Sequence, residues 1–244
     1  GSHVSPPVKL RIRSTKLGKV RFVSHRDGAR LFERALRTVG LPVATSEGFT
    51  PRPKISFGLA LPTGGESIAE YTDLQLRSSV GIDDIDLDEL PGRLSSSLPS
   101  GIDVLAAGVV PPGSASLQEA VVACTWELTG GGLSSDDHRS AQRLLAADHL
   151  VIERERKGKC RRDDVRAAIL DVRVDPSGDR TVADLATVGR ALRPSEFAQL
   201  AYPHVDPRDV RVLRTHQWIE HDGEQHEVLT LPADVRASTL AVPA

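Results

Sequence analysis

The fold is decided first by residues 8–40, which read VKLRIRSTKLGKVRFVSHRDGARLFERALRTVG. Up to residue 23 apolar side chains alternate with Lys and Arg, and a period of two is typical of a strand with one buried face. The alternating apolar residues are Val8, Leu10, Ile12, Val20 and Phe22. The pattern predicts one or two strands, broken near Gly18, whose second face is cationic.

A helix is predicted directly after these strands. Ser24 suits the N-cap position, with Asp27 three residues further on, and Gly40 suits the C-terminal end. The apolar residues between them share one helical face: Gly28, Phe32, Ala35, Leu36 and Val39. On the outer side, four arginines fall within about 80° of one another, because an α-helix turns about 100° per residue. These are Arg26, Arg30, Arg34 and Arg37.

The rest of the chain continues to alternate strands and helices. Strands predicted at residues 54–60, 69–76 and 102–110, with a helix at 86–98, complete the order β-α-β-β-α-β of a ferredoxin-like domain. The sequence PPGS at residues 111–114 predicts a linker. Beyond it similar elements are predicted at residues 119–128, 135–147, 150–157, 169–174, 181–186, 193–201 and 210–218. We therefore expect an α+β fold with two ferredoxin-like (βαββαβ) halves in tandem, residues 4–113 and 114–228, followed by a flexible tail, 229–244.

Composition excludes several classes of protein. Of the 244 residues, 39% are hydrophobic and 26% are charged, values typical of globular proteins. No run approaches the roughly 18 apolar residues of a membrane span, so we expect a cytoplasmic protein without membrane contact. The two cysteines, Cys124 and Cys160, are too few for an iron–sulfur cluster, and the common phosphate-loop, dinucleotide and zinc motifs are absent. No cofactor or metal is expected in this chain.

Charge is segregated along the sequence although the net charge is only −2. Residues 1–60 contain 12 Lys or Arg and three acids, whereas residues 61–137 contain two Arg and 13 acids. Such asymmetry favours a polyanion-binding surface in the first segment. The acidic residues 66–89 are then a candidate docking surface for a protein partner. The alternative is that the basic residues 1–60 and the acidic residues 61–137 neutralise each other within one fold.

The candidate nucleic-acid-binding residues extend this argument. Pro51 and Pro53 stiffen the loop that carries Arg52 and Lys54, and a pre-positioned guanidinium pairs well with phosphate. Phe49 is either a base-stacking residue or an anchor of this loop in the core. Together with the helix arginines, Lys16 and Lys19 complete the first basic patch. The alternative is that these charges form an ordinary solvated surface. A second basic patch is predicted at Arg156, Lys157, Lys159 and Arg161.

His25 is the candidate catalytic residue. It lies at the predicted helix N-terminus, a position that suits a general acid or base. A metal-independent endoribonuclease would use His25 in this way, with Arg52 or Lys54 stabilising the phosphate in the transition state. The alternative is a histidine with a purely structural role.

Six short motifs resemble the radical SAM-linked protein family. They are FVSHRD (22–27), ERALR (33–37), GFTPRPKISF (48–57), GGES (64–67), EY (70–71) and, more loosely, LRPSE (192–196). The family is a domain of unknown function, encoded beside or fused to a radical SAM protein. The resemblance implies a radical SAM partner that carries the iron–sulfur cluster, S-adenosylmethionine and often cobalamin, and a setting in RNA modification.

Three functions are consistent with these observations. The first is a non-catalytic, radical SAM-associated accessory protein that binds structured RNA, such as tRNA or rRNA, for modification by the partner. The second is the endoribonuclease that uses His25. The third is a protein-only adaptor whose arginines contact an acidic protein.

Overall fold

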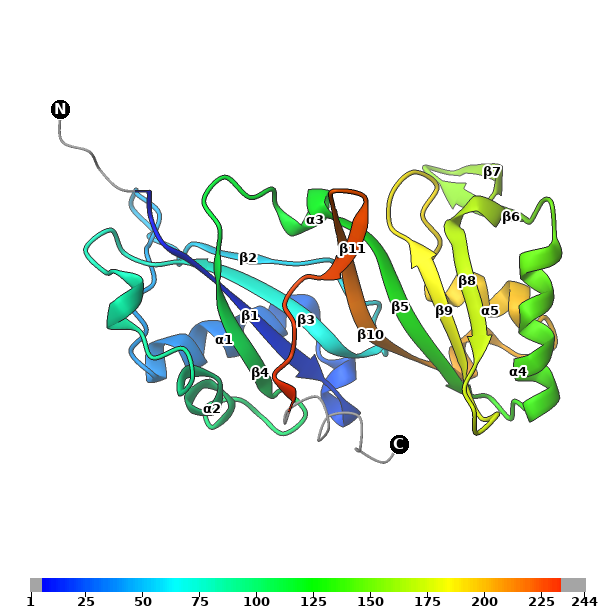
Figure 1. Cartoon of the computed structure of the whole chain (residues 1–244), viewed down its shortest axis with the longest axis horizontal. Coiled ribbons are helices and arrows are strands. Elements are labelled where there is room, and N and C mark those ends of the chain that lie inside the picture. Colours follow the sequence, from blue (N-terminus) through cyan, green and yellow to red (C-terminus); the bar gives the residue numbers. More distant parts are fainter. Residues whose placement is uncertain (1–5, 234–244) are drawn as a thin grey trace. The chain divides into compact units, whose positions relative to one another are not determined.

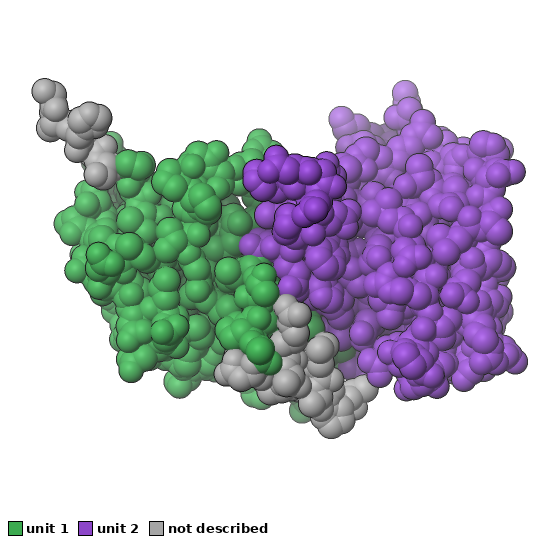
Figure 2. Space-filling view, in the orientation of Figure 1, with its two compact units in different colours: residues 1–119, 229–244 green, residues 120–228 purple. Residues whose placement is uncertain are grey.

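The computed structural model describes residues 6–233, which form two compact units (Figures 1 and 2). Unit 1 contains the described residues up to Glu119 and from Leu229 onward, and unit 2 contains Ala120–Val228. The fold is α+β, with antiparallel strands and a few helices in each unit. Within residues 6–233 no helix is both long enough and apolar enough to cross a membrane.

Unit 1 contains an antiparallel sheet with two α-helices. Its elements are β1 (Lys9–Lys16), η1 (Gly18–Phe22), α1 (His25–Thr38), β2 (Ile55–Phe57), β3 (Glu66–Gln75), η2 (Ile82–Asp84), α2 (Leu90–Ser95) and β4 (Val104–Val110), where η is a 3-10 helix. The strands lie in the order β4-β1-β3-β2, and each neighbouring pair is antiparallel. A short helix, α3 (Leu117–Ala120), spans the sequence boundary between the units.

The apolar face of α1 packs on the sheet of unit 1. Phe32 and Leu36 belong to one buried cluster with Leu10 and Ile12 of β1 and Leu74 of β3. Burying each such side chain contributes about 1.5–3 kcal/mol. The alternating apolar side chains of β1 and the apolar face of α1 therefore pack in a common core, as the sequence predicts.

Both ends of α1 are formed by the residues that the sequence indicates. The Ser24 hydroxyl accepts a hydrogen bond from the Asp27 backbone N–H at 3.1 Å, which satisfies one of the free donors of the first turn. Gly40 follows the helix with a φ of 69°, a left-handed conformation that glycine adopts without a steric penalty. The helix is thus closed by local chemistry at each end.

The second face of β1 differs from the expectation of a solvated cationic surface. Arg11 is largely buried and donates to the Asp73 carboxylate at 2.7 Å. Arg13 is only 1% exposed and donates to the backbone oxygens of Ile68 and Leu229 at 2.9 and 3.0 Å. A buried guanidinium needs such partners because leaving water is costly. These two arginines stabilise the fold and are removed from the candidate binding surface.

Unit 2 contains antiparallel strands, several helices and an additional two-stranded ribbon. Its elements are β5 (Val121–Gly130), α4 (Ser135–Ala141), η3 (Gln142–Ala146), β6 (Val151–Arg156), β7 (Lys159–Asp164), η4 (Arg166–Ala168), β8 (Ile169–Val174), β9 (Thr181–Ala186), α5 (Pro194–Ala201), η5 (Pro207–Asp209), β10 (Val210–His221) and β11 (Glu224–Glu227). The strands lie in the order β10-β5-β9-β8 with antiparallel neighbours, and β11 pairs with β10. Strands β6 and β7 pair with each other as a separate two-stranded ribbon.

Several predicted elements have different bounds in the structure. The segment around Val20 is the 3-10 helix η1 rather than a strand, and the helix predicted at residues 86–98 is only the six-residue α2. Strands β7 and β11 were not predicted, because their sequences KCRRDD and EQHE lack apolar alternation.

The predicted boundaries can be compared with the two units. The predicted linker, residues 111–114, precedes the boundary at 119/120, and the described residues from Leu229 onward belong to unit 1. Of the predicted flexible tail, Leu231 is buried, and residues 234–244 lie outside the described residues.

The base of the β6–β7 ribbon is held by hydrogen bonds to Asp164. Its carboxylate accepts from the backbone N–H groups of Leu150 and Arg166 at 3.0 and 3.1 Å, and it contacts His149 Nδ1 at 2.6 Å. The Leu150 backbone bond, followed by the His149 and Arg166 bonds, lowers the pKa of Asp164 to about 2. The ionised carboxylate thus holds together the start of β6 and the end of β7 at the base of the ribbon.

We expect Asp164→Asn to lower the free energy of unfolding at pH 7, with a deficit that narrows at acid pH. The folded-state pKa lies below the ordinary value of 3.8, so the carboxylate stabilises the fold above that pH. This contribution is lost as the pH falls toward about 2. Urea unfolding of both proteins across this range measures the difference. Asp148, which is exposed and lies near Asp164 in the ribbon's flank, provides the control: the effect of Asp148→Asn on the free energy of unfolding should not change with pH in this way. If the loss of stability in Asp164→Asn were the same at every pH, the assignment would be contradicted.

Candidate functional site

Helix α1 presents four arginines on one exposed face. Arg26, Arg30, Arg34 and Arg37 are all exposed, as their spacing predicts. Arg30 approaches Asp27 at 3.7 Å in a solvated pair, a contact that contributes little. Within the described residues, the other three form no ion pair. We call these four side chains the arginine face of α1.

The loop of residues 46–54 displays three more predicted residues. The backbone of Ser46 donates to Arg52 O at 2.8 Å, and the Arg52 N–H donates to Ser46 Oγ at 3.0 Å, so the loop is closed at its neck. At its tip Phe49 is fully exposed, which excludes the core-anchor alternative for the free chain. Arg52 and Lys54 are exposed as well, and neither has an ion-pair partner in the part of the chain that the structure describes.

The remaining predicted residues of unit 1 lie around the start of α1. Lys19 is exposed on η1, whereas Lys16 is half-buried and donates to the backbone oxygen of Val23 at 2.7 Å. The His25 ring meets the Phe57 ring edge-on, with 5.2 Å between centroids. Lys16 and His25 therefore differ from the arginines in that each is held by a specific contact.

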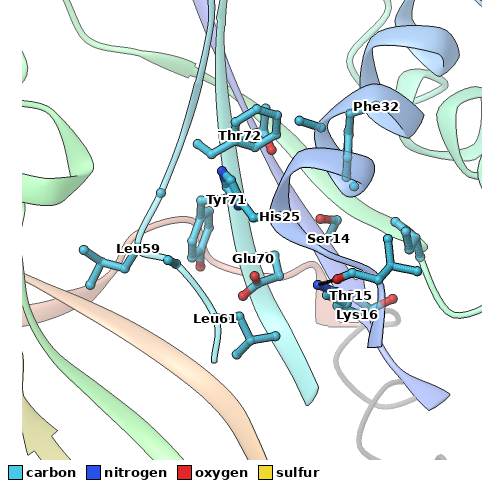
Figure 3. Close-up of a pocket in the computed structure, with 17 residues that line it drawn as sticks. Ser14, Thr15, Lys16, His25, Phe32, Leu59, Leu61, Glu70, Tyr71 and Thr72 are labelled. Carbon is cyan, nitrogen blue, oxygen red and sulfur yellow. Dashed lines mark hydrogen bonds between the residues drawn. The ribbon is translucent and has the colours of Figure 1, made fainter. Parts of the chain in front are cut away.

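A hollow lies in unit 1 beneath the first turns of α1 (Figure 3). Its walls come from α1, from the end of β1, from β3 and from the segment that follows β2. The cavity volume is about 70 Å³, enough for about five water molecules. The polar residues that line it include Ser14, Thr15, Lys16, His25, Glu70 and Thr72. Figure 3 shows Glu70, Tyr71 and Thr72 along β3, with Leu59 and Leu61 on the segment beside it.

The hollow brings together residues that the sequence does not associate. His25 and Lys16 were predicted as separate candidates, and both line it. Ser14, Thr72 and Phe57 were not predicted. A signal was present, because the core-facing positions of β1 change from Leu10 and Ile12 to Ser14 and Lys16, but period alone does not distinguish a polar pocket from a solvated strand end.

The second basic patch lies on the β6–β7 ribbon of unit 2. Arg156, Lys157, Lys159 and Arg161 are exposed, and Lys157 and Gly158 form the turn with positive φ angles of 53° and 72°. None of the four has an ion-pair partner among residues 6–233. By contrast, Arg154, midway along the ribbon, donates to Glu196 at 2.8 Å.

No metal centre is found in the described chain. Among residues 6–233, no three His, Cys, Asp or Glu side chains gather as metal ligands do. The chemistry that the site offers consists of guanidinium and ammonium groups, one imidazole and several hydroxyls. These groups suit the binding of an anion with aromatic parts, and one of them can transfer a proton.

Comparison with known proteins assigns the chain to a family. Residues 9–194 match the family described as "Uncharacterized protein conserved in bacteria (DUF2344)", and the chain belongs to this family. The match includes all of the sheet of unit 1, the hollow and the ribbon. No curated protein matches the chain. The family description agrees with the expected domain of unknown function and names no activity.

The exposure of Phe49 gives a stability prediction. Because its ring contacts water rather than the core, Phe49→Ser should change the free energy of unfolding by less than about 0.5 kcal/mol. Phe32→Ala, which empties a core position of the same residue type, should cost about 3–5 kcal/mol. Urea unfolding followed by circular dichroism compares the two variants. A loss of several kcal/mol for Phe49→Ser would show that the ring is packed.

Proposed function

We propose that this protein is a non-catalytic accessory protein that binds structured RNA, such as tRNA or rRNA, for a separate radical SAM enzyme. The observation that carries the proposal is the arginine face of α1, where Arg26, Arg34 and Arg37 are exposed and form no ion pair within the described residues. Exposed cations on a rigid element attract phosphates and release condensed counterions, which makes affinity dependent on salt.

The loop of residues 46–54 supports binding to RNA rather than to an acidic protein. It combines the exposed cations Arg52 and Lys54 with the fully exposed Phe49. An aromatic ring beside cations provides a stacking surface for an unpaired base, which single-stranded parts of structured RNA offer. The basic end of the β6–β7 ribbon is a second, independent contact in this proposal.

The fold proposal is that each unit is ferredoxin-like. In unit 1 the order β4-β1-β3-β2, with α1 after β1 and α2 after β3, corresponds to the βαββαβ arrangement. In unit 2 the order β10-β5-β9-β8, with α4 after β5 and α5 after β9, corresponds in the same way. The β6–β7 ribbon is then an insertion between α4 and β8.

The partner proposal rests on the resemblance to the radical SAM-linked family. The partner would hold the iron–sulfur cluster, S-adenosylmethionine and often cobalamin, and both proteins would work in the cytoplasm. Within the acidic stretch 66–89, Asp73 is paired with Arg11, whereas the acids between 83 and 89 are exposed. These exposed acids, Asp83, Asp84, Asp86, Asp88 and Glu89, are the candidate docking residues.

The RNA proposal predicts a change in the salt dependence of binding. For wild-type protein and mixed tRNA, affinity should fall steeply between about 50 and 200 mM salt. The double variant R34S/R37S should reduce the slope of log affinity against log salt by about 1–2, because up to two phosphate contacts are lost. The control R139S/R208S removes the same charge from unit 2, where both arginines are paired with aspartates, and should leave the slope nearly unchanged.

The same experiment discriminates among the three functions. An affinity that does not respond to salt would contradict phosphate binding and favour the adaptor. If tRNA incubated in EDTA is cut by wild-type protein but not by His25→Ala, the endoribonuclease replaces the accessory role. The observation that favours it is that His25 and Lys16 line the same hollow. Intact RNA would remove that alternative.

The partner proposal predicts a complex. The full chain, expressed with the radical SAM protein encoded beside it, should co-purify with that protein. The triple variant D83N/D86N/D88N should weaken the complex, because electrostatic complementarity would be lost at the docking residues. The R139S/R208S protein is again the control. Absence of a complex with or without S-adenosylmethionine and tRNA would contradict the accessory role.

A further inference from the structure

The hollow has a polar floor where the core face of the sheet should be apolar. Along β1 the helix-facing side chains change from Leu10 and Ile12 to Ser14, and across the ladder Ile12 pairs with Thr72 and Ser14 with Glu70. The change from apolar to polar side chains thus occurs at adjacent positions on both β1 and β3. It is not explained by a strand end that faces solvent, because a helix covers these positions. Here the floor lies under the start of α1.

Two residues of this floor carry hydroxyl groups that line the hollow. Ser14 is 1% exposed and Thr72 is 2% exposed, and both line the hollow. Within residues 6–233 neither hydroxyl oxygen is a fully enclosed atom that lacks a partner, so both are reached from the hollow. A hydroxyl in a pocket wall can donate or accept a hydrogen bond. The hydroxyls are available to a molecule in the hollow.

The helix above the floor leaves room for such a molecule. Gly28 lies in the interior of α1 and lines the hollow, and a Cβ placed on it would have no neighbour within 4 Å. Its φ is not positive, so the backbone does not require glycine. Glycine in a helix interior is less favourable than alanine. Neither packing nor backbone conformation requires glycine at residue 28, so the space beside it is available to an occupant beneath α1.

The lining chemistry suits a planar heterocycle attached to a phosphate. Phe57 and Phe32 provide aromatic surface, with 6.4 Å between their ring centroids, and Leu59 and Leu61 add apolar surface. The two hydroxyls and the His25 ring provide donors and acceptors for the edge of a base. The ammonium of Lys16 and the first turn of α1 provide positive potential for a phosphate.

The hollow and the arginine face share the first turn of α1. His25 lines the hollow and Arg26, the next residue, begins the exposed face. A ligand here is therefore placed to be part of a polyanion that the arginines hold, and an unpaired nucleotide of a folded RNA has this geometry.

We infer that the hollow beneath α1 is a binding pocket for one everted nucleobase of the bound RNA. The inference rests on the proposed function and specifies what the RNA must offer, namely an unpaired nucleotide that can leave its stack. Ser14 and Thr72 contact the base edge, the aromatic and leucine side chains contact its faces, and Lys16 lies near its phosphate. The arginine face holds the adjoining backbone.

The test uses the full chain with AMP, GMP, CMP, UMP and inorganic phosphate as separate probes in calorimetry. At least one nucleotide should bind more tightly than phosphate. Gly28→Leu should weaken that binding by about tenfold or more, because the new side chain fills the hollow. Gly92→Leu is the matched control, since Gly92 also lies in a helix with open space where its Cβ would be, and it does not line the hollow. It should bind as the wild type does.

A second variant keeps the volume of the hollow unchanged. Thr72→Val removes one hydroxyl from the floor and should weaken nucleotide binding several-fold without lowering the melting temperature. If Gly28→Leu fails to fold, this variant still decides the assignment. Equal affinity for phosphate and every nucleotide, or no nucleotide binding at millimolar concentration, would overturn the pocket.

The pocket and the RNA proposal can fail separately. If Gly28→Leu and Thr72→Val both bind mixed tRNA like wild type while R34S/R37S does not, the pocket is overturned and the RNA proposal stands. If nucleotides bind in the hollow but tRNA does not bind to the chain, the pocket stands as a site for free nucleotides and its extension to RNA is overturned.

Discussion

The packing of α1 on β1 and β3 fixes the functional surface of unit 1. Phe32, Ala35 and Leu36 are buried with Leu10 and Ile12, so the rotation of the helix about its axis is set by the core. With that rotation fixed, the arginines of the opposite face must point to solvent, since they lie about half a helical turn away. The same contact ends at Phe32, and nearer the N-terminus the small residues Gly28 and Ala29 leave the hollow between helix and sheet.

The structure separates two kinds of arginine that sequence composition counts together. Arg11 and Arg13 are buried and bonded to a carboxylate or to backbone oxygens, and they compensate polar groups inside unit 1. Arg34 and Arg37 are solvated, so their charge acts on whatever approaches the helix. The positive charge of residues 1–60 therefore overstates the charge available for binding. The exposed positive charge of this segment is concentrated on α1 and on the loop of residues 46–54. This distribution says more about a binding surface than the total charge does.

Unit 2 shows how a poorly amphipathic segment acquires fixed structure. The β6–β7 ribbon has almost no apolar alternation, and its strands pair only with each other. It is held instead by polar contacts. At its base Asp164 accepts hydrogen bonds from the backbone N–H groups of Leu150 and Arg166, and midway along it Arg154 donates to Glu196 of α5. The carboxylates are ionised at neutral pH, so the ribbon is anchored while its basic end is exposed. In this way a charged segment is presented without a core of its own.

The sequence by itself determined the α+β class, the position and ends of α1, most strands and the exposure of the arginine face. These features depend on residues close together in the chain, through the periods of 2 and 3.6 and through capping by Ser24 and Gly40. Tertiary structure decided the burial of Arg11 and Arg13, the exposure of Phe49, the β7 and β11 pairings and the hollow. Each of these depends on which distant segments meet: Ser14 and Thr72 are ordinary strand residues until α1 covers them. A pocket is a property of surfaces brought together across 58 positions of sequence, and local periodicity carries no information about that distance.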